Sequence, residues 1–111
     1  MSNNILVIIA TGDIVKARTG VMYAVNSYKN EWVDDVKLVF FGPAESLLLD
    51  DEEIQKYLGE FQFLEQNVIA CKAVSDDIGI SEDLEKLDVI VDYVGKPISD
   101  YIGAGYTPMV W

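Results

Sequence analysis

The chain contains no histidine and a single cysteine, Cys71, among its 111 residues. Without histidine it cannot build a His-ligated zinc site, a Ser-His-Asp triad or a Cys-His dyad. One cysteine cannot form a disulfide within the chain. These absences exclude three common kinds of active centre and leave Cys71 as the only thiol.

Positive charge is scarce as well. Eight Lys and Arg residues stand against 19 Asp and Glu residues, which gives a net charge of −11, and Arg18 is the only arginine. A surface that follows the phosphates of nucleic acids or anionic membranes needs clustered Lys and Arg. We therefore expect neither nucleic acid nor a membrane among the partners, and we attribute the acidic excess to solubility.

Long apolar runs are also missing, although half of the residues are apolar. Residues 1–4 carry no basic charge and precede only a short apolar run, unlike a signal peptide, and no stretch approaches the length of a membrane span. We therefore expect a cytoplasmic protein. The length and apolar content predict one domain, residues 1–111, whose core needs neither a disulfide nor a metal. Acidic pairs such as Asp76-Asp77 are typical of helix starts, so we expect no metal and no cofactor.

The chain alternates between short β-branched runs and segments with helical spacing of apolar residues. Strands are predicted at residues 5–10, 36–41, 68–71, 89–94 and 106–111. Helices are predicted at about residues 14–31, 44–49, 50–66, 73–78, 81–87 and 95–102. Strict alternation with short connections predicts an α/β fold, a doubly wound three-layer α/β/α sandwich with an open five-stranded parallel sheet. Pro108 makes the last strand an edge strand or the partner of another subunit.

Three local signals sharpen this assignment. Asp13 is a good N-cap for the first long helix, and Gly20 inside that helix indicates close packing. Asp50, with Glu53 three residues later, resembles a capping box for the helix at 50–66.

Ligands of an open parallel sheet bind beyond the carboxyl ends of the strands. Four predicted turns lie there, at residues 11–13, 42–45, 71–73 and 95–97. They point to a small-anion site that would use Lys72 and Lys96 together with Thr11, Gly12 and Gly42. The alternative is that the lysines are ordinary surface residues at helix starts. The glycine pattern matches neither a dinucleotide fingerprint nor a phosphate loop.

Cys71 ends a predicted strand and precedes a helix start. Unpaired N–H groups there, with Lys72 next in the chain, would stabilise its thiolate and make the sulfur nucleophilic. The alternative is a buried cysteine that serves as a small apolar core residue. Position alone leaves both interpretations open.

Three stretches resemble the DsrE/DsrF-like sulfur-relay family. They are KLVFFGPAESLLL (37–49), NVIACKAVSDDIGI (67–80) with a cysteine at a strand end, and the closing strand, helix and aromatic-containing strand at 88–111. The resemblance implies that Cys71 carries a persulfide and hands it to a partner protein. It also implies a homo-oligomer (dimer, trimer or hexamer), and the last strand, with Tyr106, Met109 and Trp111, suits subunit packing.

The leading hypothesis is therefore a small persulfide carrier, with sulfur donor and acceptor proteins as partners. Two departures from the family bear on it, because Lys72 replaces the small residue expected after the cysteine and Asp76-Asp77 would oppose a thiolate. The alternatives are a non-catalytic oligomeric or regulatory module with Cys71 in its core, and a binder of small anions or nucleotides.

Overall fold

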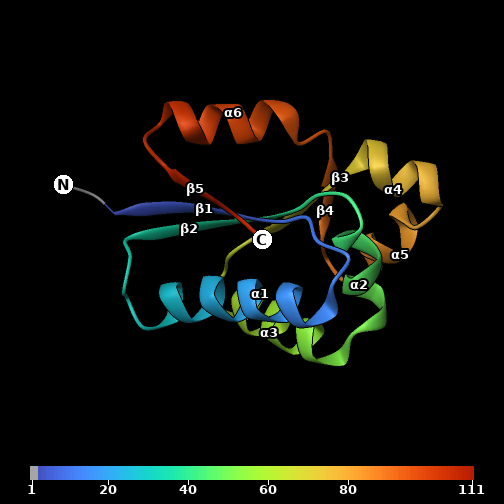
Figure 1. Cartoon of the computed structure of the whole chain (residues 1–111), viewed down its shortest axis with the longest axis horizontal. Coiled ribbons are helices and arrows are strands. Elements are labelled where there is room, and N and C mark those ends of the chain that lie inside the picture. Colours follow the sequence, from blue (N-terminus) through green and yellow to red (C-terminus); the bar gives the residue numbers. More distant parts are fainter. Residues whose placement is uncertain (1–2) are drawn as a thin grey trace.

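The computed structural model describes residues 3–111 and contains one five-stranded parallel sheet with the strand order β4-β3-β2-β1-β5 (Figure 1). The strands are β1 (Asn4–Ile9), β2 (Asp35–Phe40), β3 (Val68–Cys71), β4 (Ile90–Asp92) and β5 (Thr107–Val110). The helices are α1 (Ile14–Lys29), α2 (Ala44–Asp50), α3 (Glu52–Phe63), α4 (Lys72–Ile78), α5 (Ser81–Lys86) and α6 (Gly95–Gly103). The predicted α/β sandwich with an open five-stranded parallel sheet is confirmed.

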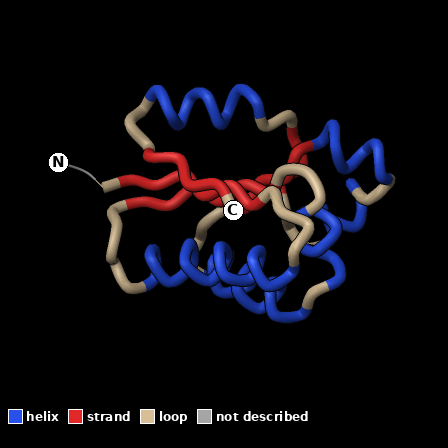
Figure 2. Tube along the Cα trace, viewed as in Figure 1, coloured by secondary structure: helices blue, strands red, loops and turns tan. Residues whose placement is uncertain are grey.

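Helices cover the two faces of the sheet unequally (Figures 1 and 2). On one face, α1 and α3 bury the larger apolar cluster, which includes alternate residues of β1 and β2 and also Leu84 of α5. On the other face, α6 is the long helix that lies over the sheet, and it has no fully buried residue. A smaller cluster lies beneath it, formed by Leu6, Ile8, Val39, Cys71 and Val94.

The central strands are apolar on both sides because both of their faces are covered. Ile5 to Ile9 of β1 are all buried, with Val7 and Ile9 in the larger cluster and Leu6 and Ile8 in the smaller one. This division follows from the alternation of side chains along a strand. It confirms the prediction that the first strand lies inside the sheet.

Helix α1 begins and packs as the sequence predicts. The Asp13 side chain accepts hydrogen bonds from the N–H groups of Val15 and Lys16, as an N-cap does. A Cβ at Gly20 would lie 2.6 Å from Cγ of Trp111, so only glycine lets α1 approach the end of the chain this closely. Both predictions about this helix are confirmed.

The predicted capping box at Asp50 is wrong by one residue. Asp50 ends α2, and Asp51 is the N-cap of α3, where its carboxylate accepts the N–H of Ile54 and binds Arg18 through two hydrogen bonds. Arg18 holds the pKa of the Asp51 carboxyl below its usual range. A tertiary contact from α1 therefore selects between two adjacent aspartates.

The last two strands are shorter than predicted. Strand β4 ends at Asp92 because Val94 leaves the sheet, becomes buried and precedes α6. Strand β5 ends at Val110, although the carbonyl of Trp111 still accepts the N–H groups of Ala10 and Thr11. Within residues 3–111, every helix is too short or too polar to cross a membrane.

Candidate functional site

The connections that follow β3 and β4 both begin at the smaller cluster, against which Val74 of α4 and Ile98 of α6 pack. After β3 the chain passes through α4 to α5, which packs with the α1 and α3 side, whereas after β4 it passes through α6 on the other face (Figure 1). Cys71 and Asp92 end these neighbouring strands and are register partners. In open α/β sheets, ligands bind beyond the carboxyl ends of the strands. Cys71 lies at this edge of the sheet, although the strand order reverses between β1 and β5 and not at β3.

The Cys71 thiol is free but covered. Cys71 is the last residue of β3 and the N-cap of α4, and only 5% of it is exposed. Its side chain belongs to the smaller cluster under α6, with Val94 among its members. Its surroundings are therefore apolar, and a reagent must displace part of the cover before it can meet the sulfur.

Helix α4 forms one part of this cover, and it is weakly anchored. Of its seven residues only Ser75 is buried, while Val74 packs half-buried against the smaller cluster. The hydroxyls of Ser75 and Ser81 lie 2.6 Å apart, and Ser81 donates to Asp76 at 2.5 Å. These hydroxyl bonds join α4 to the first residue of α5.

Lys72 and Lys96 each pair with a carboxylate of their own helix. Lys72 Nζ lies 2.6 Å from Asp76 Oδ2, and this hydrogen bond raises the pKa of Lys72 and lowers that of Asp76. Lys96 Nζ lies 3.1 Å from Asp100 Oδ2 on the surface. Both pairs have the i,i+4 spacing that favours ion pairs on helices. The ammonium group of Lys72, which was expected to stabilise the Cys71 thiolate, pairs with Asp76 on α4. The same contact neutralises the Asp76 carboxylate, which was expected to oppose that thiolate.

The remaining predicted anion-binding residues have local structural contacts. Thr11 Oγ1 accepts the N–H of Asp13 at 3.0 Å, and a Cβ at Gly12 would touch Pro43 at 3.4 Å. Gly42 has φ +86, a value that favours glycine, and its N–H donates to Glu45. The structure therefore brings the turns after β1 and β2 into contact. No hydrogen bond or ion pair among residues 3–111 joins these turns to Lys72 or Lys96.

Glu45 is the titratable residue at this edge that the sequence analysis missed. It lies in the first turn of α2 and is fully buried. Its Oε2 accepts the Gly42 N–H at 3.1 Å, while Oε1 has no hydrogen-bond partner among the described residues. Burial raises the pKa of Glu45 to about 7. A carboxyl that titrates near neutral pH could exchange a proton there, and its position within the apolar segment 44–49 was the only signal in the sequence.

The residues predicted to pack subunits together at the last strand are half-buried within the chain. Met109 and Trp111 pack half-buried against the larger cluster, and the Tyr106 hydroxyl donates to Asp35. Burial raises the pKa of Tyr106 to about 12. Pro108 and Val110 remain exposed on this strand, Val110 at 68%.

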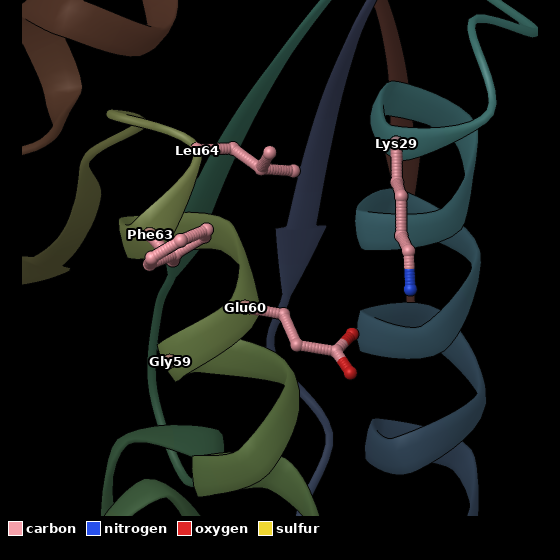
Figure 3. Close-up of a pocket in the computed structure, with 5 residues that line it drawn as sticks. All are labelled: Lys29, Gly59, Glu60, Phe63 and Leu64. Atoms are coloured by element: carbon pink, nitrogen blue, oxygen red, sulfur yellow. The ribbon is translucent and has the colours of Figure 1, made fainter.

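The hollows of the surface lie away from Cys71. One of about 430 Å³ lies between the C-terminal ends of α1 and α3 (Figure 3). Another, of about 350 Å³ and largely acidic, lies between α4 and α5 beside Asp76, and a third of about 400 Å³ lies at the amino ends of β2, β3 and β4. None of these three is lined by Cys71. Within residues 3–111, acidic and cysteine side chains form no group of three that could hold a metal ion.

Comparison with known proteins supports the fold. No described protein family matches the sequence. No curated protein matches it either. A solved structure of a conserved protein of unknown function from Bacteroides thetaiotaomicron is similar, with a TM-score of 0.82 and 23% sequence identity over 97% of this chain and 95% of that one. At this identity the likeness establishes the shared architecture.

Proposed function

We propose that this protein is a small DsrE-like persulfide carrier that holds sulfane sulfur on Cys71 and acts in the cytoplasm. The observation that carries the proposal is the position of a free thiol at the carboxyl end of β3, the edge at which open parallel sheets bind their ligands. The resemblance of residues 67–80 to the sulfur-relay family also points to the sulfur of Cys71 as the carrier atom.

The chemistry is a transfer between thiols. The Cys71 thiolate attacks the outer sulfur of a donor persulfide, R–S–SH, which forms a new S–S bond and breaks the S–S bond of the donor. The donor leaves as the thiolate R–S⁻, and Cys71 becomes the persulfide Cys71–S–SH. An acceptor thiolate then removes the outer sulfur in the same way and returns Cys71 to a thiolate. No oxidant or reductant is consumed.

Access to Cys71 is the step on which the proposal depends. We propose that α4 opens locally, because a short helix with one buried residue is held by few contacts. The bond between Ser75 and Ser81 then resists this opening. The closed state shields the sulfur from solvent, and the open state presents it to donor and acceptor.

A second candidate is a non-catalytic oligomeric or regulatory module in which Cys71 is an ordinary core residue. The apolar surroundings of Cys71 favour it, since Leu6, Ile8, Val39 and Val94 form a continuous cluster with the thiol. The small-anion binder has less support, because Lys72 and Lys96 already have carboxylate partners.

Intact-mass measurement after incubation with a polysulfide donor tests the carrier. We expect the protein to gain a sulfur atom that a reductant removes, and Cys71→Ser to gain none. Equal gain in Cys71→Ser, or no gain in the native protein, would overturn the proposal and favour the module.

A second measurement tests the opening of α4. We expect Ser81→Ala to raise the rate at which a thiol reagent labels Cys71 by roughly five- to thirtyfold, because it removes two hydrogen bonds, to Ser75 and to Asp76, of about 1 kcal/mol each. Ser99→Ala is the matched control, since the Ser99 hydroxyl bonds only to the Gly95 carbonyl of its own helix. Equal rates in the native protein and Ser81→Ala would show that opening of α4 does not limit access.

A further inference from the structure

The hollow between the C-terminal ends of α1 and α3 combines a cavity with a projecting aromatic ring. Lys29, Gly59, Glu60, Phe63 and Leu64 line about 430 Å³ (Figure 3). Phe63 is 87% exposed, more than any other large apolar side chain among residues 3–111. A phenylalanine this exposed gains from burial against a partner. The projecting Phe63 ring, called the knob below, and the hollow therefore form one surface patch, the α1–α3 patch.

No contact among residues 3–111 explains why residue 59 is a glycine. It lies inside α3, where glycine weakens a helix, and a Cβ added there would meet nothing within 4 Å. At Gly20, by contrast, a Cβ would overlap Trp111. The missing side chain at Gly59 leaves a flat place on α3 that a partner could approach closely.

The charges of the patch match each other. Glu60 on α3 points toward α1, and Lys29 runs along α1 on the other side of the gap (Figure 3). Neither forms an ion pair among the described residues. The whole chain has a net charge of −11, whereas this patch carries one charge of each sign. Two copies related by a two-fold axis would place Lys29 of one opposite Glu60 of the other, twice.

We propose that this patch is the interface of a homodimer, in which Phe63 of each protomer enters the hollow beside Gly59 of its partner. An isologous interface requires one patch to hold both the knob and the hole, together with reciprocal charges. The α1–α3 patch meets these requirements. The proposal is independent of the role of Cys71, which lies on the α6 side of the sheet.

Sedimentation equilibrium of the full chain over micromolar to millimolar concentrations tests the dimer. We expect a reversible monomer–dimer equilibrium in which Phe63→Ser raises the dissociation constant at least about tenfold, as loss of a central aromatic residue does. Gly59→Gln should weaken the dimer similarly without harming the fold, because its side chain meets nothing within the protomer. A monomer at every concentration would overturn the proposal.

A charge swap tests the two-fold arrangement. Lys29→Glu alone and Glu60→Lys alone should each weaken the dimer, since each places like charges opposite one another. The double variant should restore dissociation to within about threefold of the native protein. Failure of the double variant to recover would refute the reciprocal pairing.

Val110→Ser is the matched control at the β5 edge, the other surface suited to self-association. It should leave the dimer unchanged. A dimer that dissociates in Val110→Ser but persists in Phe63→Ser would move the interface to β5 and overturn the proposal.

Discussion

The two faces of the sheet differ in how many apolar side chains they bury. On the α1 and α3 side, the larger cluster contains buried residues from both helices and from the central strands, including Phe61 and Leu58 of α3. On the α6 side, five buried residues lie under a helix whose own side chains are at most half-buried. Stability is therefore concentrated on one face, and the free thiol lies on the other.

This difference separates the parts of the molecule that can move from those that cannot. Opening α4 exposes little apolar surface, whereas moving α3 would break the main core. The proposed carrier would need a rigid frame and one mobile cover, and the unequal faces fit this requirement. The same logic places a self-association patch on the rigid side, where Gly59 and Phe63 keep a fixed relation.

Removing one apolar side chain from each face of the sheet should give the largest difference in stability between the two faces. Phe61→Ala should reduce the free energy of unfolding by about 3–5 kcal/mol, because Phe61 is fully buried and packs edge-on against Tyr28. Ile98→Ala on the sheet-facing side of α6 should cost only about 1 kcal/mol, since Ile98 is half-buried. Urea denaturation gives both values, and similar losses at the two sites would show that the faces are equally firm.

Glu45 should make the rigid face sensitive to pH. Its pKa is raised from 4.5 to about 7, so the folded protein keeps this proton at pH values where the unfolded chain has lost it. The stability it contributes is full below pH 4.5 and is lost as the pH rises through 7. Glu45→Gln should therefore gain stability on the native protein between pH 4.5 and 8, by up to about 3 kcal/mol.

Thermal unfolding of both proteins across this pH range measures that difference. Glu52→Gln is the control, because Glu52 is an exposed carboxylate of the neighbouring helix and forms no ion pair among the described residues. A difference between native protein and Glu45→Gln that stays constant with pH would contradict a raised pKa at Glu45.

Adding one methyl group to each face should give effects of opposite sign. Gly20→Ala should destabilise by about 1–3 kcal/mol, because the new Cβ would lie 2.6 Å from Trp111 and 2.7 Å from Ile9. Gly103→Ala, at the end of α6, should stabilise by about 0.5 kcal/mol, since nothing lies within 4 Å of its Cβ. Denaturant midpoints check both, and a loss of stability at Gly103 would mean that α6 packs more tightly than described.

Some features of the site were readable from the sequence because they depend on short spacings. The Asp13 cap and the tight packing at Gly20 were predicted from local chemistry. The pairs of Lys72 with Asp76 and of Lys96 with Asp100 also rest on a short i,i+4 spacing, but they were not predicted. The choice between Asp50 and Asp51 was not predicted either, because Arg18 lies 33 residues from its partner.

By itself the sequence determined the α/β sandwich, the order of its elements and the position of Cys71 at a strand end, because apolar periodicity and turn chemistry act over a few residues. Only the tertiary structure decided how exposed Cys71 is and that Glu45 is buried. Side-chain burial depends on which face a residue takes in the pleat and on which helix crosses above it. For Cys71 that face is the α6 side, where α4 and the start of α6 close over the sulfur.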